Sequence, residues 1–499
     1  MHNVEEYLQE CVDSLLAQTF DDFEVILVDD GSTDGSPKIA KRFARRDPRF
    51  RYIRTDNQGL GAARNVGVRM ATSEFLAFLD SDDALPGDSY EYMIRTLEET
   101  GSDFVVGSMQ RWSSTHSTEP PWIRRIHRER RLKVALDDFP EIMHNVFAWN
   151  KVFRRSFWDE SGLVFPEGVR YEDQVTVTEA YLKAKRFDII RRSVYLWRIR
   201  EDGSSITQRR HELDDLRDRI ATKRLTTEVV NRFGSDLSKE EWYRQGLPGD
   251  LPFYFREVPT CSSAYWDLLS DGVREMFEGL PPIEESRLPV GQRVVGWLVA
   301  HDRRAEASEV VAYLAERSGP AVERRGDHMV ALLPFVDDRG LAPPELFHLQ
   351  DHELEWDARL LEVDWSGSTL VLSGFALVRG VPTQWSEQSP EVWLESADAE
   401  RADCAVEIRA CPEATAWVSR SEQNYDGTGF DARIDVTRLG SPGTWTVKLS
   451  RTAGPVRRAG GFRTSAVNGG GELVGLSLGE ISAELSFTSR AGLLVEIAG

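Results

Sequence analysis

The chain has 499 residues, of which 41% are hydrophobic and 29% are charged, and its formal net charge at pH 7 is −21. This length predicts about two to four domains, and so acidic a balance excludes a general nucleic-acid-binding protein, which needs a basic surface. No run of about 18 apolar residues indicates a membrane span, and no basic segment followed by an apolar one indicates a signal peptide.

The cysteines show neither the spacing of a zinc site nor a dense disulfide framework; they are Cys11, Cys261, Cys404 and Cys411. Cys404 and Cys411 could face each other in a hairpin, but we expect buried free thiols. Free thiols are typical of a reducing compartment, so the sequence predicts a cytoplasmic protein.

Predicted strands and helices alternate along the first part of the chain. Helices are expected over 4–18, from about 37, after 57–65 and over 90–99, and strands over 24–28, 51–54, 75–79 and around 104–106. Such alternation predicts an α/β fold with a mainly parallel sheet and helices on both faces. In sheets of this kind, ligands bind beyond the carboxyl ends of the strands.

Carboxylates follow two of these predicted strands at that edge. The residues are Asp29, Asp30, Asp80, Asp82 and Asp83. Clustered like charges repel unless a cation or a polar ligand lies among them. The alternative is an acidic turn that caps the following helix, but the shared position of both groups favours a ligand site.

A strongly basic segment lies between about 107 and 142, and includes Arg124, Arg125 and Arg128. It is either a solvated surface or a positive rim for an anionic substrate, because guanidinium groups match phosphates and carboxylates. Trp149 and Lys151 follow, and are either packing residues or part of a substrate wall.

Two acidic residues, Glu172 and Asp173, open an apolar helical stretch further along the chain. Carboxylates at a helix start complement the helix dipole, so capping accounts for them as well as a functional role does.

The remainder predicts three further parts. Residues 211–350 are helix-rich and carry no evident chemistry, so we expect a helical linker domain after a first domain of residues 1–210. Residues 351–465 contain short strands separated by Gly, Pro and Ser, which is typical of an immunoglobulin-like β-sandwich. Residues 466–499 predict an extra β segment or a partial module.

Several motifs in the first domain together resemble family 2 glycosyltransferases of the GT-A (Rossmann-like) fold. They are Asn3–Phe20, Val28–Asp34 (VDDGSTD), Ala63–Gly67 (ARNVG), Phe78–Asp83 (FLDSDD) and Tyr171–Gln174 (YEDQ). The helical region and the sandwich are similar to those of bacterial teichoic-acid-type enzymes. The first domain also resembles the amino-terminal domain of actinobacterial proteins fused to a CDP-glycerol glycerophosphotransferase, although no such second enzyme is visible.

The resemblance implies a donor site made of His2, Asp29, Asp30, Arg64, Asn65, Asp80, Asp82, Arg198 and Arg200. In the family pattern, Asp30 accepts a hydrogen bond from the uracil of a UDP-sugar, and His2 occupies the position of an aromatic residue that stacks on the base. Arg64 corresponds to a residue near the diphosphate, and Asp80 or Asp82 to one near the ribose.

The resemblance also implies how the transfer reaction is catalysed. Asp82 and Asp83 match ligands of Mg²⁺ or Mn²⁺, which offsets the charge of the diphosphate leaving group. Asp173 matches the general base, with Glu172 beside it, and a single displacement with one base inverts the anomeric carbon. We expect the acceptor to contact Arg124, Arg125, Arg128, Trp149, Lys151 and Gln174.

The sequence thus predicts a metal-dependent, inverting glycosyltransferase that acts on a cell-envelope polymer or glycan, in the cytoplasm or peripherally at the inner membrane face, and that could form a homo-oligomer. Alternatives are a transferase with another activated donor, such as CDP-glycerol, and a non-catalytic glycan-binding scaffold. The family begins with a strand that has no counterpart before Asn3. We therefore expect the natural start to lie upstream and to supply that strand.

Overall fold

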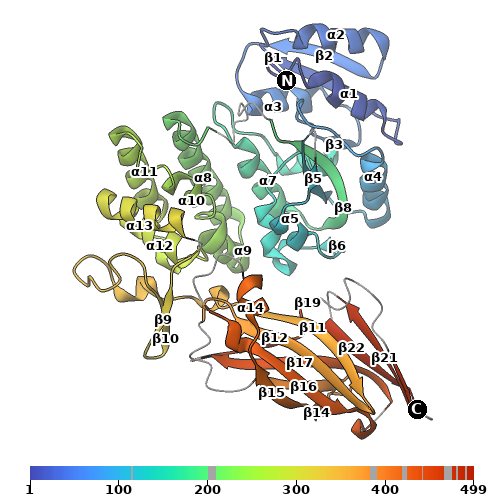
Figure 1. Cartoon of the computed structure of the whole chain (residues 1–499). Helices are drawn as coiled ribbons and strands as arrows, with labels where there is room; N and C mark the ends of the chain where they lie inside the picture. The colour runs from blue at the N-terminus through green and yellow to red at the C-terminus, as the bar shows by residue number, and fades with distance from the viewer. Residues whose placement is uncertain are drawn as a thin grey trace. The chain divides into compact units, whose positions relative to one another are not determined.

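The computed structural model describes residues 1–113, 116–200, 209–317, 319–381, 390–418, 424–440, 442–453, 455–465, 475–478, 481–488 and 492–498 (Figure 1). The chain forms two compact units. The first contains Met1–Ser286 and Val299–Asp302, and the second contains Arg287–Leu298 and Arg303–Gly499.

The central layer of the first unit is a six-stranded sheet of order β3-β7-β4-β8-β6, with β5 paired to β4. The strands are β3 (Phe75–Ala77), β4 (Phe104–Trp112), β5 (Ser117–Thr118), β6 (Arg131–Val134), β7 (Lys151–Arg154) and β8 (Phe187–Arg198). β4 and β8 are parallel, whereas β7 runs antiparallel to both β3 and β4. The first three side chains of β4 are fully buried, which explains its continuous apolar run Phe104–Val106.

A separate two-stranded parallel sheet pairs β1 (Val25–Asp30) with β2 (Phe50–Thr55). The Met1 ammonium donates to the Val28 carbonyl oxygen at 2.7 Å, and the Asp30 amide donates to the Met1 carbonyl oxygen at 2.9 Å. In the described part of the chain, no strand joins β1 to β3. Side chains of both strands instead line one cavity.

The helices of the first unit follow the predicted alternation and continue past residue 210 (Figure 1). They are α1 (Leu8–Leu16), α2 (Ser36–Arg46), α3 (Leu60–Met70), α4 (Ser89–Thr100), α5 (Pro121–Ile126), α6 (Arg155–Ser161), α7 (Glu172–Lys183), α8 (Leu213–Phe233), α9 (Asp236–Glu241), α10 (Leu251–Phe255) and α11 (Ser263–Met276). The first compact unit therefore runs to Ser286 and includes Val299–Asp302, so it contains the helices that follow the predicted boundary at residue 210.

The second unit is a β-sandwich preceded by a short helical part. Its first sheet has the order β15-β16-β12-β11-β19, and its second has the order β14-β13-β17-β22-β21-β20, with β18 paired to β17. Inward side chains such as Leu372, Phe430 and Val447 form the core between the sheets. β20 to β22 pair within the second sheet, so the terminal segment extends this sandwich.

The elements of this part are α12 (Val290–Ala300), α13 (Arg304–Glu316), β9 (Val322–Arg325), β10 (His328–Ala331), β11 (Trp356–Ser366), β12 (Thr369–Val378), β13 (Glu391–Ser396), β14 (Arg401–Asp403), β15 (Ala405–Arg409), α14 (Pro412–Trp417), β16 (Gly429–Asp435), β17 (Gly443–Ala453), β18 (Val456–Gly460), β19 (Thr464–Ser465), β20 (Leu476–Leu478), β21 (Ile481–Thr488) and β22 (Gly492–Ala498). Among the described residues of the whole chain, no helix is long and apolar enough to cross a membrane.

Candidate active site

The acidic turn after β3 is held against the end of β8 by its last carboxylate. Asp83 is buried; its Oδ2 accepts a hydrogen bond from the Tyr195 hydroxyl and its Oδ1 accepts one from the Arg198 amide, both at 2.7 Å. Burial, together with the charges of Asp82 and Asp80, raises the pKa of Asp83 well above its usual value. This geometry favours a structural role for Asp83, although the sequence predicted a metal ligand.

Two arginines from the end of β8 cover the middle of the same turn. The Arg200 Nε donates to Asp82 Oδ2 at 2.9 Å, and the Arg198 Nε donates to the Asp82 carbonyl oxygen at 2.6 Å. Burial raises the pKa of the Asp82 carboxyl, and the Arg200 cation opposes that shift. The turn thus combines clustered carboxylates with cations that could contact a diphosphate.

Arg64 of α3 connects the acidic turn to the start of α7. Its Nη2 donates to Asp80 Oδ1 at 2.7 Å, and its Nη1 donates to Glu172 Oε1 at 2.5 Å. Burial raises the pKa of Glu172 to about 7, against the opposing effect of the Arg64 cation. Glu172 is therefore engaged in a buried ion pair.

Asp173 differs from these carboxylates. It lies in the first turn of α7, and no described residue donates a hydrogen bond to its carboxylate, whose pKa is raised by burial. A partly buried, unpaired carboxylate with a perturbed pKa is typical of a functional site.

The turn after β1 bonds to the start of α3. Both oxygens of Asp30 accept backbone hydrogen bonds, from the Gln58 amide at 2.9 Å and from the Gly59 amide at 3.0 Å. Gly59 has φ 91°, a conformation that glycine adopts without strain. The exposed His2 ring lies beside this turn, with Nδ1 2.8 Å from the Asp30 carbonyl oxygen. His2 and Asp30 are therefore neighbours.

Asp29 is fully buried and saturated with donors. Its carboxylate accepts from the Tyr52 hydroxyl at 2.6 Å, the Arg54 Nη1 at 2.9 Å and the Ser32 amide at 2.9 Å. These bonds lower its pKa despite its burial. These contacts favour a structural role for Asp29 in the turn, although the sequence predicted a contact with the nucleotide sugar.

One cavity of about 2230 Å³ brings the central residues together. It is lined by Asp30, Arg64, Asp80, Asp82, Asp173 and Arg200, and also by apolar side chains of β1 and β3. Residues that the sequence placed far apart along the chain thus face one space, which is large enough for a nucleotide sugar.

Comparisons with known proteins identify the family. Residues 1–161 match the family model described as glycosyl transferase family 2. The putative glycosyltransferase EpsH of Bacillus subtilis is 36% identical over 284 residues, which cover 56% of this chain and 79% of EpsH. The chain belongs to glycosyl transferase family 2. The predicted family and enzyme class are confirmed.

Two further similarities concern this glycosyltransferase. The poly(ribitol-phosphate) beta-glucosyltransferase of Bacillus spizizenii is 30% identical over 212 residues, covering 42% of this chain and 32% of that protein. The crystal structure of S. aureus TarS matches 100% of this chain and 84% of its own chain, with a TM-score of 0.51 and 17% identity. The TarS match confirms the predicted α/β fold with a helical part and a C-terminal sandwich.

The residues predicted to contact the acceptor occupy different environments. Arg124, Arg125 and Arg128 are all exposed, on and after α5, and of these three Arg125 lines the cavity. The buried Lys151 ammonium donates to the carbonyl oxygens of Asn145 and Phe147.

Other predicted residues of this glycosyltransferase are also engaged in internal contacts. The Trp149 ring stacks on Tyr195 with centroids 4.0 Å apart. The buried Asn65 amide nitrogen donates to the Phe165 carbonyl oxygen at 2.9 Å. Gln174 Oε1 accepts from Arg219 Nη1 at 3.1 Å. These contacts favour structural roles.

The carboxylate oxygens of the acidic turn are ligands of the kind that a hard divalent cation prefers, but the described residues alone do not form a complete metal site. The described residues hold no group of three or more His, Cys, Asp or Glu side chains placed to bind a metal. Asp82 and Asp80 face the cavity, and Mg²⁺ is often held by one or two carboxylates together with substrate phosphates. Asp80 and Asp82 are therefore suited to a divalent cation that the phosphates of a bound diphosphate also coordinate.

The contribution of α8 could not be predicted from the sequence. Asp215 and Arg219 are buried and bond to Tyr171 and Gln174, on either side of Glu172 and Asp173. Their spacing of four residues places them on one helix face, but nothing in the sequence pairs that face with α7.

Proposed function

We propose that this enzyme transfers a sugar from a UDP-sugar to a hydroxyl group of a cell-envelope polymer, with inversion and with Asp173 as the general base. The proposal rests on the surroundings of the Asp173 carboxylate. Its carboxylate faces the cavity without a hydrogen-bond donor from the described residues, whereas Asp80, Asp82 and Glu172 are paired with arginines.

A general base must be ionised and within reach of the hydroxyl that attacks. Burial raises the pKa of Asp173 and makes its carboxylate a better proton acceptor, while the Arg64 and Arg219 cations oppose that rise and favour the ionised form. Such a base contributes a factor of about 10² to 10⁴ in rate.

The leaving diphosphate needs positive charge. Arg200 and Arg64 line the cavity and supply guanidinium donors of the kind that match phosphate oxygens. Asp82, with Asp80 beside it, would hold Mg²⁺ or Mn²⁺, which offsets charge on the diphosphate when bound. Asp30 and His2 lie together at the cavity edge, where the resemblance places the nucleotide base.

The proposed acceptor is an anionic polymer such as a polyol-phosphate chain. The name of the Bacillus spizizenii relative specifies a poly(ribitol-phosphate) glucosyltransferase. In this chain, the basic residues of α5 include Arg125, which lines the cavity. Positive charge beside a base suits an acceptor that carries both hydroxyl groups and phosphates.

Asp173→Asn tests the proposal. We expect transfer from a panel of UDP-glucose, UDP-galactose and UDP-N-acetylglucosamine, with Mn²⁺ and a poly(ribitol phosphate) acceptor, to fall by at least about 10²-fold. UDP affinity, measured by calorimetry, stays within about threefold, because asparagine has nearly the same shape. Glu160→Asn, an exposed change on α6, is the control. Retained transfer in Asp173→Asn removes Asp173 as the base.

A further inference from the structure

The residue before the acidic pair has an unusual backbone conformation. Tyr171 is the N-cap residue of α7 and has φ 64° and ψ 28°, in the left-handed region that L-residues with bulky side chains rarely adopt. Such a conformation persists only where the surroundings determine it, and it occurs preferentially at functional sites. The contacts of Tyr171 therefore indicate what holds Glu172 and Asp173 in place.

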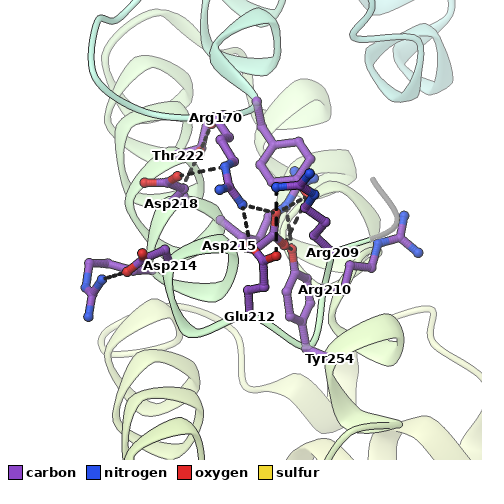
Figure 2. A network of polar contacts seen from close by, with 12 residues as sticks. Arg170, Arg209, Arg210, Glu212, Asp214, Asp215, Asp218, Thr222 and Tyr254 are labelled. Carbon is purple, nitrogen blue, oxygen red and sulfur yellow. Dashed lines mark hydrogen bonds and ion pairs between the residues drawn. The ribbon is translucent and has the colours of Figure 1, made fainter. Parts of the chain in front are cut away.

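Two residues of α8 contact the Tyr171 side chain and fix its position. Its hydroxyl donates to Asp215, with distances of 2.9 Å to Oδ1 and 3.1 Å to Oδ2. Its ring lies under the Arg219 guanidinium, whose Cζ is 3.4 Å from the ring centroid. The fully buried Asp215 also accepts from the Tyr254 hydroxyl at 2.9 Å and from Arg170 Nη1 at 3.2 Å. Figure 2 shows Arg170, Asp215 and Tyr254 meeting in this network.

The same face of α8 holds the backbone and side chains on both sides of Tyr171. The Thr222 hydroxyl donates to the Arg170 carbonyl oxygen at 3.1 Å, and Arg219 Nη1 donates to Gln174 Oε1 at 3.1 Å. Asp215, Arg219 and Thr222 are spaced at i, i+4 and i+7, so they share one face of the helix. α8 thus contacts the turn immediately before and immediately after Glu172 and Asp173.

Arg219 is in turn held in place by a buried ion-pair network. Arg219 forms an ion pair with Asp250 at 3.1 Å, and Lys223 pairs with the same Asp250 oxygen at 2.9 Å. Arg219 and Lys223 are buried. Buried charges cost desolvation that an apolar contact between two helices would avoid, so packing alone does not account for this network.

We infer that Asp215 and Arg219 are positioning residues of the transfer reaction: through Tyr171 and Gln174 they hold the first turn of α7 so that the Asp173 carboxylate points into the cavity. The inference rests on the proposed function, in which Asp173 is the base. It makes α8 a part of the catalytic unit, where the sequence predicted a linker without chemistry.

The charge of Arg219 gives this role a measurable signature. The charged groups that act on Asp173 are Arg64 of α3, Asp80 of the acidic turn, Lys151 of β7, Glu172 and Arg219. Arg219 lowers the pKa of Asp173, so removal of its charge raises that pKa. Because the base must be ionised, the acidic limb of the kcat profile then moves to higher pH.

The test compares Arg219→Met with Arg219→Lys in the full chain, using the UDP-sugar of the panel that is turned over fastest. We expect Arg219→Met to lower kcat by about 10- to 100-fold, because a small misplacement of a reacting group has a large effect. Its donor KM stays within about threefold and its acidic limb moves to higher pH. Arg219→Lys keeps the wild-type limb and recovers part of kcat. Arg217→Gln, an exposed change on the same helix, leaves kcat unchanged.

A second pair of variants tests the hydrogen bond between Tyr171 and Asp215 without changing Arg219. Tyr171→Phe and Asp215→Asn each lower kcat, and the double variant loses no more than the more impaired single one, because the hydroxyl acts through Asp215. If Arg219→Met does not fold, as judged by circular dichroism and UDP binding, the Tyr171 and Asp215 pair decides the matter.

Two results overturn the inference. One is a loss of kcat with an unmoved acidic limb and no recovery in Arg219→Lys, which indicates a purely architectural role. The other is multiplicative losses in the double variant. Failure of the proposed function is seen separately, because Asp173→Asn then retains transfer whatever the α8 variants do.

Discussion

At the scale of single residues, the carboxylates of the cavity share one electrostatic property. Burial raises the pKa values of Asp82, Asp83, Glu172 and Asp173 above their usual range. The folded chain without ligand therefore holds protons at these positions more tightly than the unfolded chain does. Ionisation of these groups works against folding, and a bound cation relieves that cost.

Glu172 predicts a pH dependence of stability. Its pKa rises from 4.5 to about 7 on folding. Below about pH 4.5 both states are protonated and the group adds nothing, whereas between these values only the unfolded state ionises. The contribution of Glu172 to the free energy of unfolding therefore falls as the pH rises through this window and stays at its lowest above it.

Denaturant titrations at pH 5, 6, 7 and 8 without donor check this. Glu172→Gln should lose less stability across the series than the wild type, by about 1 to 3 kcal/mol. The exposed Glu160→Gln change should follow the wild-type slope. Equal slopes for Glu172→Gln and wild type would show that Glu172 ionises normally.

The second prediction at this scale concerns the cation. Protons and Mn²⁺ compete for the same carboxylates, so Mn²⁺ with UDP should raise Tm more at pH 8 than at pH 5.5. Asp82→Asn should lose most of the Mn²⁺-dependent part of that increase. Asp271→Asn, exposed on α11, is the matched control. An unchanged Mn²⁺ response in Asp82→Asn would move the cation to other carboxylates.

At the scale of elements, the short helix α5 places one basic residue, Arg125, at the cavity. Arg124 and Arg125 lie in its last turn, and Arg128 follows it. If an anionic acceptor passes here, Arg124→Ala, Arg125→Ala and Arg128→Ala combined should raise the acceptor KM about tenfold, since exposed charge contacts are individually weak. Donor hydrolysis should not change.

The single change Arg125→Ala should account for most of that effect, because this arginine lines the cavity. Arg95→Ala on α4, an exposed arginine paired with Glu99, provides the control. A normal acceptor KM in the triple variant would place the acceptor on another face.

The elements themselves could be predicted well from periodicity, and the family motifs from their order. The roles of particular side chains could not. The resemblance to the family implied that Asp83 binds metal, but its partners, Tyr195 and the Arg198 amide, come from a strand more than one hundred residues later. Lys151 was predicted to contact the acceptor from its charge, but its ammonium is enclosed by carbonyl oxygens.

The sequence also does not reveal that the first compact unit continues past residue 210. Apolar periodicity marks α8 as a helix, but it carries no information about which partner its polar face meets. Asp215 and Arg219 are buried against α7, and such long-range polar contacts leave no local pattern in a sequence. Composition and periodicity therefore do not show that the first compact unit includes α8.

At the scale of the whole molecule, the chain has two compact units with separate cores, and it crosses between them after Ser286, after Leu298 within α12, and after Asp302. All of the described residues that line the cavity belong to the first unit. Units with separate cores generally unfold as separate cooperative transitions, and a ligand stabilises only the unit that binds it. We therefore expect two transitions in scanning calorimetry, of which UDP with Mn²⁺ raises one.

Leu372→Ala identifies the other transition. Leu372 is fully buried in the sandwich core, and its truncation should cost about 2 to 5 kcal/mol in that unit. The transition that responds to UDP should keep its midpoint in this variant, and donor hydrolysis should persist after the sandwich has melted. A single transition that shifts as a whole with both UDP and Leu372→Ala would mean that the two units are energetically coupled, and that the sandwich contributes to the stability of the site.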